Sequence, residues 1–319
     1  MQPLVSVICL CYNHLRFLPE ALASIRNQAY PNLEIIIVDD ASTDGSAAWL
    51  AAYSQQHPQV KYIRHRQNTG NTRAFNEAFR LSSGEYIIDF ATDDILLPDR
   101  VAEQVKAFQG LDKSYGVVYT DAELIDENSH RVGYFYRRDA QGKVISRTPS
   151  GYVFNQILQY AFLCPPTLMF RRALLEKTGG YDETLAYEDF DIWVRSAQEF
   201  QYYFLDKILT RRRVHAASLS HKLYTPGDKQ LASTVIICRK ARQLIRTPAE
   251  KAALVVRVKS ELRQAVFTQN FPEASELVKL LEELRGLDWR YRLLKWVAQQ
   301  EIQLGFIRKW YYQWFYNKS

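Results

Sequence analysis

Pairs of acidic side chains follow two apolar runs in the N-terminal third of the sequence. Asp39 and Asp40 come directly after one run, and Asp93 and Asp94 come shortly after another. Aspartates after strands often only cap a helix or form a turn. Two such pairs can also hold a nucleoside diphosphate, provided that a divalent cation lies between the carboxylates and the phosphates that they would otherwise repel. Both interpretations remain open from these residues alone.

Glycine-rich phosphate loops do not follow these runs. The first apolar run ends at Tyr12 and Asn13, and the other polar clusters contain aspartate, serine and threonine. Neither the dinucleotide-binding pattern G-x-G-x-x-G nor the P-loop pattern G-x-x-x-x-G-K-[ST] is present at these positions. The sequence therefore lacks the main motif of ordinary dinucleotide-binding proteins and that of P-loop proteins at these positions.

Strand-like runs alternate with helical periodicity through the first hundred residues, which predicts an α/β fold with a parallel sheet covered by helices. Helices are expected to begin near Pro19, after Asp44-Gly45 and around Thr72. Ligands of open parallel sheets bind outside the carboxyl ends of the strands, so the polar clusters are expected to meet at one edge. The expected strands are Val5–Cys11, Glu34–Val38, Val60–Ile63 and Tyr86–Phe90.

The rest of the chain is less regular. The segment Gly116–Thr120 is strand-like, Arg137–Thr148 is polar and is expected to be a loop, and Val153–Phe162 is amphipathic. A further strand is expected at Tyr202–Ile208. From about Leu231 onward the pattern predicts helices, with a break at Asn270-Phe271-Pro272.

Composition and charge narrow the class of protein. Hydrophobic residues make up 47% of the 319 residues, which excludes a disordered chain. No apolar stretch reaches the roughly 18–20 residues of a membrane-spanning helix, and no secretory signal is visible at the N-terminus, so a cytoplasmic location is expected. Residues 231–319 hold 16 basic and 8 acidic residues, whereas residues 1–230 hold 25 and 27. This uneven distribution argues against a nucleic-acid-binding protein.

The spacing of the four cysteines fits neither a disulfide framework nor a zinc site. Reduced and mostly buried thiols are expected for Cys9, Cys11, Cys164 and Cys238.

Taken together in order along the chain, several segments resemble family 2 glycosyltransferases of the GT-A fold. The resemblance implies an inverting, metal-dependent transferase (EC 2.4 class) that uses a nucleotide-sugar donor, UDP in particular, and a glycan or lipid-linked acceptor in polysaccharide or cell-envelope glycan synthesis. It implies a Rossmann-like, mostly parallel sheet flanked by helices, with a C-terminal helical extension. The segments that carry the resemblance are VSVICLCYN (5–13), LEIIIVDDASTDGS (33–46), NTGNTRAFNEA (68–78), GEYIIDFATDDILLPDR (84–100), CPPTLMFRRALLEKTGGYDE (164–183) and EDFDIWVR (188–195).

The domain organisation follows from the same resemblance. Residues 1–230 are expected to form the GT-A domain, with a nucleotide-sugar half at about 1–100 and an acceptor half at about 101–230. Residues 231–319 are expected to form a basic and aromatic helical extension.

The resemblance also implies roles for single residues. Tyr12 would stack on the base, Asp40 would accept a hydrogen bond from it, and Asp39 would serve the ribose or its own loop. Asp93 is assigned to the sugar side and Asp94 to the divalent cation, Mn²⁺ or Mg²⁺. Further donor-binding candidates are Asn13, Asn68, Gly70 and Arg73, the last of which has an exposed first-turn arginine as its alternative.

The catalytic base is expected at Glu188-Asp189, with Asp189 as the residue that takes the proton of the acceptor hydroxyl. One alternative is that Glu188 and Asp189 merely cap a helix. Another is that Glu188 or Asp191 is the base. His215 follows Arg211-Arg212-Arg213 and is similar to a late Arg-X-His segment of the family, so it is a candidate metal ligand beside phosphate-neutralising arginines.

One position departs from the family pattern. The string Asp-X-Asp-Asp usually begins with aspartate, but Ala91 stands first here. This change affects metal affinity and donor preference rather than the fold. A catalytically silent nucleotide-sugar binding module therefore stays open, and a nucleotidyltransferase on a similar sheet is a second alternative that lacks its glycine-rich basic loop.

The C-terminal segment 307–316 mixes cations with aromatic rings. This composition is typical of a peripheral anchor at a membrane surface, here the inner face, and equally of a helix that packs its aromatic side chains on the domain.

Overall fold

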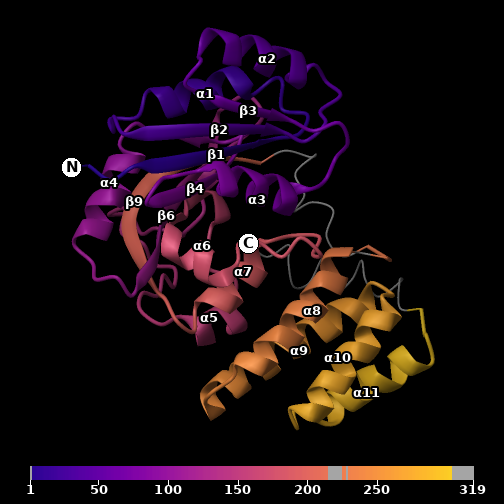
Figure 1. The fold of residues 1–319 in the computed structure, drawn as a ribbon. Helices are drawn as coiled ribbons and strands as arrows, with labels where there is room; N and C mark the ends of the chain where they lie inside the picture. The colour runs from indigo at the N-terminus through magenta and orange to yellow at the C-terminus, as the bar shows by residue number, and fades with distance from the viewer. Residues whose placement is uncertain (1, 215–224, 228, 304–319) are drawn as a thin grey trace. The chain divides into compact units, whose positions relative to one another are not determined.

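The computed structural model describes residues 2–214, 225–227 and 229–303, and these form two compact units (Figure 1). The first unit contains the described residues of Met1–Val153, Phe162–Thr184 and Ser196–His215. The second contains the described residues of Phe154–Ala161, Leu185–Arg195 and Ala216–Ser319. Each unit is described by itself below.

The N-terminal part of the first unit is a parallel sheet with helical crossovers, as predicted. Strand β1 pairs with β2 on one side and with β4 on the other, and β3 pairs with β2. The elements are β1 (Val5–Cys11), α1 (Leu18–Arg26), β2 (Leu33–Asp39), α2 (Ser46–Gln56), β3 (Lys61–Arg64), α3 (Asn71–Leu81) and β4 (Tyr86–Ala91).

The sheet continues beyond β4 with strands of mixed direction. Its order is β3-β2-β1-β4-β8-β6-β9-β5, and β7 pairs with β6. Strand β8 is antiparallel to both β4 and β6, whereas β6 and β9 are parallel. The elements of this part are β5 (Ile95–Leu96), α4 (Arg100–Gln109), β6 (Tyr115–Ile125), β7 (Arg131–Tyr134), η1 (Pro165–Thr167), β8 (Met169–Arg171), α6 (Arg172–Thr178) and β9 (Gln201–Arg213).

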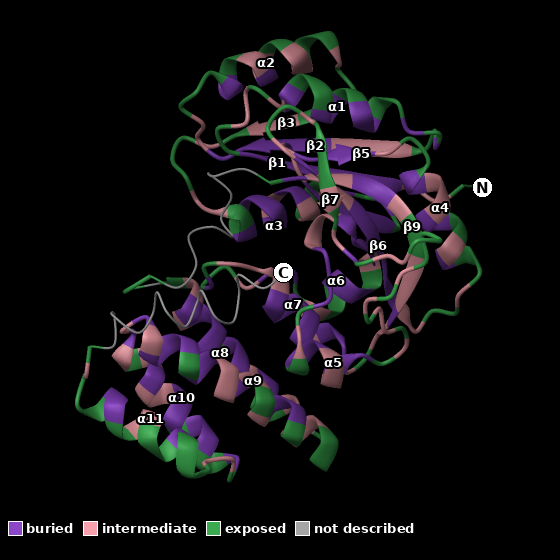
Figure 2. Ribbon diagram, turned by 180° about the vertical axis from the view of Figure 1, so that it is seen from behind, coloured by how far each residue is buried: buried purple, intermediate pink, exposed green. Residues whose placement is uncertain are grey.

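Helices cover the apolar faces of this sheet. All residues of β1 are buried, which agrees with a central strand that is covered on both sides (Figure 2). Leu18, Leu22 and Ile25 form the buried face of α1, while its other face is exposed. All four cysteines are buried and free, as predicted. Burial raises the pKa of Cys164 and Cys238 to about 12, so these thiols are unreactive.

Register brings the polar clusters together at one edge of the sheet. Cys11 at the end of β1 pairs with Asp39 at the end of β2, and Leu10 pairs with Ala91 at the end of β4. The segments that leave these parallel strands therefore start side by side, at the edge where ligands of such sheets bind.

The second unit is helical in its described residues. Helix α9 is the longest, and Thr247 forms a capping box with Glu250 at its N-terminus. The predicted break at Asn270 separates α9 from α10. None of the described helices has the length and apolarity that a membrane span requires. The helices of this unit are α5 (Phe154–Gln159), α7 (Asp189–Ser196, of which Ser196 belongs to the first unit), α8 (Lys229–Leu244), α9 (Pro248–Phe267), α10 (Phe271–Glu283) and α11 (Trp289–Gln299).

Substitution of Gly84 tests how closely the segment before β4 approaches β1. A Cβ atom at this position would lie 2.5 Å from both the amide nitrogen and the Oγ of Ser6. We expect Gly84→Ala to lower the free energy of unfolding by about 1–3 kcal/mol, the usual cost of overpacking. Gly133→Ala in β7 is the matched control, because nothing lies within 4 Å of its added Cβ. Denaturant unfolding of both variants measures the difference, and equal stabilities would contradict the packing described here.

Candidate active site

The segments after β1 and β2 are joined by hydrogen bonds through Asn13. Its backbone N–H donates to Oγ of Ser42 (2.9 Å), and its side-chain Oδ1 accepts from the backbone N–H of Thr43 (2.7 Å). Asn13 adopts a left-handed backbone conformation (φ 60°), which asparagine tolerates better than most residues. Its neighbour Tyr12 is 45% exposed. Asn13 therefore links the loops after β1 and β2, and the side chain of Tyr12 beside it is half exposed.

Asp39 and Asp40 have different environments although they are adjacent. Asp39 is fully buried, and its Oδ1 accepts from the N–H of Ser42 (3.3 Å), while its Oδ2 has no hydrogen-bond partner in the described structure. Asp40 instead points toward the segment that follows β3. Asp39 was expected either to contact the ribose or to stabilise its own loop. Its observed side-chain hydrogen bond, from Ser42, lies within its own loop.

The carboxylate of Asp40 organises the loop that precedes α3. Its Oδ1 accepts from the N–H of Thr69 (2.8 Å), its Oδ2 accepts from the N–H of Gly70 (2.8 Å), and the Nδ2 of Asn68 donates to its backbone carbonyl (3.2 Å). Gly70 has φ +87°, a conformation that favours glycine, and immediately precedes α3. Asn68, Gly70 and Asp40, which were predicted as donor-binding residues, are therefore in direct contact.

His65 links Asp40 to α3. Its Nδ1 lies 2.7 Å from Oδ1 of Asp40, and its Nε2 lies 3.0 Å from Oε2 of Glu77. Burial lowers the pKa of His65, but the hydrogen bonds to the two carboxylates outweigh it, so the net pKa is raised. For Asp40, burial raises the pKa. The hydrogen bonds from Thr69, His65 and Gly70 outweigh this effect, so the net pKa of Asp40 is lowered.

The turn after β4 carries the second acidic pair next to the loop after β1. The N–H of Thr92 donates to the carbonyl of Leu10 (3.1 Å), and Nδ1 of His14 lies 2.9 Å from Oγ1 of Thr92. Nε2 of His14 is 4.0 Å from Oδ2 of Asp93. The structure therefore brings Asp93 and Asp94 to the same edge as Tyr12 and Asp40.

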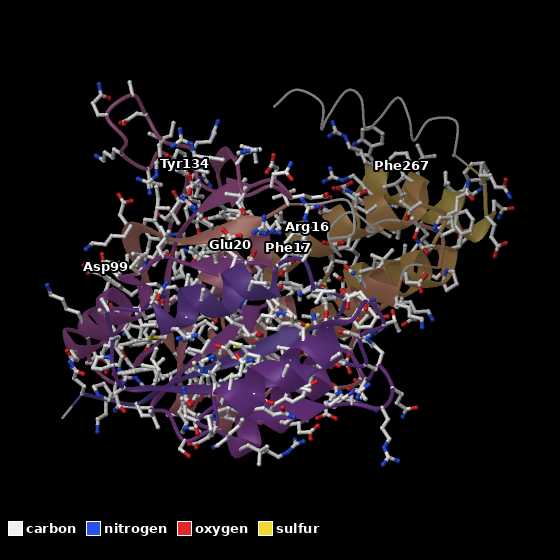
Figure 3. All side chains as sticks on the ribbon, turned by 90° about the horizontal axis from the view of Figure 1, so that it is seen from above. Arg16, Phe17, Glu20, Asp99, Tyr134 and Phe267 are labelled. Carbon is white, nitrogen blue, oxygen red and sulfur yellow. The ribbon has the colours of Figure 1, made fainter. Side chains whose placement is uncertain are left out.

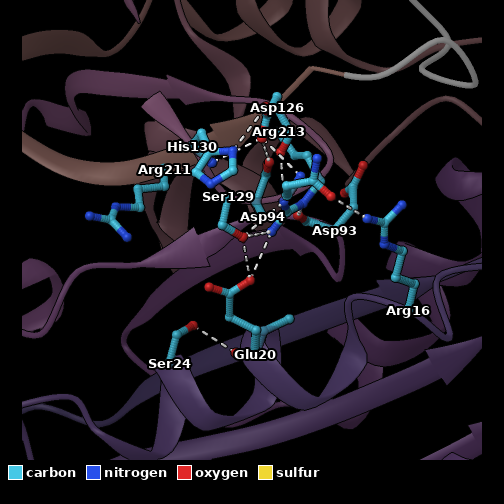
Figure 4. A network of polar contacts seen from close by, with 12 residues as sticks. Arg16, Glu20, Ser24, Asp93, Asp94, Asp126, Ser129, His130, Arg211 and Arg213 are labelled. Atoms are coloured by element: carbon cyan, nitrogen blue, oxygen red, sulfur yellow. Dashed lines mark hydrogen bonds and ion pairs between the residues drawn. The ribbon is translucent and has the colours of Figure 1, made fainter. Parts of the chain in front are cut away.

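Arg213, at the end of β9, fixes this turn. Its backbone N–H donates to Oδ1 of Asp94 (2.7 Å), and its Nε donates to the carbonyl of Asp93 (2.8 Å), as Figure 4 shows for the surrounding network. The guanidinium also reaches Glu20 of α1 (3.0 Å), and it lies over the ring of Phe17, 4.5 Å from its centroid. Glu20 and Phe17 are labelled in Figure 3. These contacts differ from the expectation that Arg213 neutralises phosphate, because its side chain is buried among protein acceptors.

Arg211 is likewise engaged by the protein, since its Nε donates to Oε2 of Glu123 (2.7 Å).

Asp94 is the more deeply buried carboxylate of its pair. Burial and the neighbouring carboxylate of Asp93 raise the pKa of Asp94 well above its ordinary value. A divalent cation would relieve this repulsion, and carboxylate oxygens are suitable ligands for Mn²⁺ or Mg²⁺. In residues 2–214, 225–227 and 229–303, however, no three His, Cys, Asp or Glu side chains together form a metal-binding group. A cation held here would therefore need ligands in addition to these described side chains.

Arg73 lies on an exposed part of α3. Its side chain is 59% exposed, and its Nε is 3.6 Å from Oε2 of Glu183. Arg73 is therefore exposed in the first turn of α3, and its donor-binding role stays a prediction.

The expected catalytic carboxylates lie in the second unit, at the start of α7. Asp191 is fully buried. Its Oδ2 accepts a hydrogen bond from Nε of Arg195 (2.7 Å) and its Oδ1 accepts one from Nζ of Lys240 (2.6 Å), so both of its oxygens are engaged. Burial raises the pKa of Glu188. Asp189 is the first residue of the helix.

Helix α8 anchors the segment that leads into α7. The N–H of Ala186 donates to Oγ of Ser233 (2.9 Å), and the hydroxyls of Tyr187 and Thr234 lie 2.7 Å apart. With the Asp191–Lys240 pair, three contacts from α8 hold the residues on both sides of Asp189.

Two predictions fall outside the part of the chain that the structure describes. They are the metal ligand His215 and the basic aromatic segment 307–316.

His14 and His65 are not among the residues that the sequence predicts for the site. A positional signal for both was available, because His14 follows Asn13 in the loop after β1, and His65 comes directly after β3, the neighbour of β2. The contacts of Arg213 had no local signal, since its partner Glu20 is 193 positions away.

Comparison with known proteins shows which family and fold this chain matches. A family model described as glycosyl transferase family 2 matches residues 6–179. An uncharacterized glycosyltransferase of Rickettsia typhi is 31% identical over 225 residues, which cover 69% of this chain and 67% of that protein.

Solved structures show the same fold. A fragment of S. aureus TarS in complex with UDP has a TM-score of 0.67 at 16% identity, over 93% of this chain and 87% of that chain. A mannosyltransferase from Pyrobaculum calidifontis in complex with GDP-Man and Mn²⁺ has a TM-score of 0.56 at 19% identity, over 100% of this chain and 89% of that chain. The match covers only 53% of a longer TarS chain. The predicted GT-A type fold is confirmed.

The His65 contacts predict a pH-dependent stability. Because the pKa of His65 is raised in the folded protein, its stabilisation is fully present below the unfolded pKa of about 6.5 and is lost as pH rises through the folded pKa. We expect His65→Gln to lose about 1.5–3 kcal/mol of unfolding free energy near pH 5.5, and less at higher pH. Denaturant unfolding across this range measures the effect. Exposed His130→Gln is the control, and a pH-independent loss at His65 would contradict the assignment.

Proposed function

The chain belongs to glycosyl transferase family 2, and we propose that this glycosyltransferase moves a sugar from a UDP-sugar to a hydroxyl group of a glycan or lipid-linked acceptor, with inversion. The observation that carries the proposal is the convergence of Tyr12, Asp40, Asp93 and Asp94 at the carboxyl edge of β1, β2 and β4. This edge is where an α/β sheet binds nucleotides. The UDP in the complex of the TarS fragment supports the choice of donor.

Base recognition is assigned to Tyr12 and Asp40. The half-exposed ring of Tyr12 can stack on a uracil. Oδ2 of Asp40 accepts one hydrogen bond, from Gly70, and a carboxylate oxygen can accept a second, which the imide N–H of the base would donate. Contacts of Asn13, Asn68 and Gly70 hold the backbone around Asp40 and Thr43, and Asp39 accepts a hydrogen bond from the N–H of Ser42.

The ribose and diphosphate are assigned to the turn after β4. Asp93 would accept from a ribose hydroxyl, and Asp94 would be a ligand of a divalent cation, with His215 as a further candidate ligand outside the described residues. The fit rests on the buried carboxylate of Asp94 and its repulsion by the adjacent carboxylate of Asp93. When bound, such a cation stabilises the diphosphate leaving group. Ala91, in place of the family's first aspartate, leaves fewer protein ligands here.

Asp189 is proposed as the general base. It would take the proton of the acceptor hydroxyl while that oxygen forms its bond to the anomeric carbon and the bond to the diphosphate oxygen breaks on the opposite face. Asp191 is unsuited to this role, since Arg195 and Lys240 occupy both of its oxygens. Glu188 remains the adjacent competitor, with a raised pKa.

The wider assignments remain proposals. They are cell-envelope or other polysaccharide synthesis, a cytoplasmic location at the inner face of the membrane with peripheral contact through 307–316, and domain boundaries near residues 100 and 230.

Donor binding tests the role of Asp94. We expect UDP to bind with a Kd that falls at least about tenfold when Mn²⁺ is present, and we expect Asp94→Asn to abolish most of this Mn²⁺ dependence. Isothermal titration calorimetry with and without Mn²⁺ measures both. Asp99→Asn is the control, because Asp99 precedes α4 outside the turn. Equal UDP binding with and without Mn²⁺ in the unaltered protein would contradict the cation role.

Transfer activity tests Asp189. We expect Asp189→Asn to lower kcat by about 10²–10⁴-fold while the Kd for UDP stays nearly unchanged, because a base acts mainly in the transition state. Transfer from a panel of radiolabelled nucleotide sugars measures the rate, and Glu188→Gln separates the two adjacent carboxylates. Retained turnover in Asp189→Asn with loss in Glu188→Gln would move the role to Glu188. Donor binding without transfer or donor hydrolysis in the unaltered protein would favour the silent binding module.

A further inference from the structure

Helix α11 presents an exposed apolar face. Trp289, Leu293 and Trp296 are 72%, 57% and 52% exposed. Spacings of four and three residues place them on one side of the helix. Such a contiguous set of large apolar side chains is uncommon on the surface of a monomeric protein and marks an interaction site more often than chance exposure.

The opposite side of α11 is already in use within the second unit. Tyr291, Val297 and Ala298 are buried, and α11 packs against α9 and α10. Nζ of Lys259 on α9 lies 4.9 Å from the centroid of the Tyr291 ring, and Figure 2 shows both buried and exposed residues along α11. The exposed face is therefore not the core-facing side of this helix.

A hollow with basic walls adjoins this face. It has a volume of about 520 Å³ and is lined by Arg285, Arg292, Lys295, Glu282 and Leu287. Arg292 lies one position before Leu293, so the hollow and the apolar face share the same stretch of helix. Three cations against one carboxylate make the hollow suitable for an anionic group.

Most of the nearby carboxylates are already neutralised. Glu282 pairs with Lys295 (2.6 Å), Asp288 pairs with Lys259 (2.7 Å), and Glu283 pairs with Arg242 (2.9 Å). Within residues 229–303, Arg285, Arg290 and Arg292 form no ion pair with a carboxylate. The region therefore has surplus positive charge next to exposed tryptophans.

We propose that the α11 surface, defined as Arg285, Trp289, Arg292, Leu293 and Trp296, docks the second unit on an anionic lipid bilayer. Tryptophan and leucine on one face of a surface helix, bordered by arginines, are suited to the boundary between headgroups and acyl chains. Lipid phosphates would enter the basic hollow while the two indole rings insert beside it. This inference concerns described residues only and does not depend on the transfer reaction.

Two other occupants fit less well. A second copy of the chain docked symmetrically on this face would place the arginines of both copies close together, and like charges at an interface are unfavourable. A free phosphate would fill the hollow but leave the tryptophans exposed. A bilayer satisfies both the charge and the apolar area.

Vesicle flotation of the full chain tests the proposal. The probes are phosphatidylcholine vesicles and vesicles with about one third phosphatidylglycerol. We expect the chain to float with the anionic vesicles, and less so as salt is raised. Because each basic residue near an anionic surface contributes about fivefold, Arg285→Gln with Arg292→Gln should weaken binding more than tenfold. Trp289→Ala with Trp296→Ala should weaken it to a similar or greater degree.

Matched controls come from the same unit. Val256→Ala on α9 removes a half-exposed apolar side chain, and Arg263→Gln removes an exposed cation from the same helix. Both should float like the unaltered chain, and circular dichroism confirms that every variant is folded. Retained flotation in both α11 double variants would overturn the proposal, as would equal binding to neutral vesicles. A dimer in sedimentation that the tryptophan variants abolish, without vesicle binding, would assign the surface to a second copy.

Discussion

Burial of carboxylates beside one another is the constraint on which this protein's site depends. A sheet edge that gathers Asp39, Asp40, Asp93 and Asp94 concentrates negative charge, and buried charge is unfavourable unless donors surround it. Asp40 obtains its donors from the loop before α3, and Asp94 obtains one from the backbone of β9. The two carboxylates differ in the number of their donors, and their pKa values shift in opposite directions. Asp40 is thereby kept ionised, whereas Asp94 retains a repulsion that a cation would relieve.

Satisfying these carboxylates ties distant parts of the first unit together. Arg213 contacts the turn after β4 and also Glu20 on α1 and the carbonyl of Asp126 beyond β6. Its guanidinium distributes its donors over three elements, which a lysine in that position could not do with the same geometry. The end of β9 thus fixes the turn in place, and any ligand of Asp93 or Asp94 meets a turn whose backbone is already ordered.

Apolar runs allowed the first four strands and the edge they share to be predicted, because buried parallel strands leave a strong local pattern. The two-residue strand β5 leaves none, since it is defined by its pairing with β9. The acidic pairs could be predicted to lie at this edge because they follow strands closely. The partners that set their protonation, His65 and Arg213, depend on which strands are neighbours, and that order is a property of the folded sheet.

A buried carboxylate is also paired with cations in the second unit, two residues after the proposed base Asp189. Asp191 is buried in the first turn of α7, and its charge is balanced by Arg195 on its own helix and by Lys240 on α8. Losing either cation would leave a buried charge partly unpaired, which is far more costly than losing an exposed ion pair. Because α8 also holds Ala186 and Tyr187, the backbone on both sides of Asp189 is fixed by the C-terminal helices. Those helices are therefore part of the support of the proposed catalytic carboxylate, in addition to carrying the α11 surface.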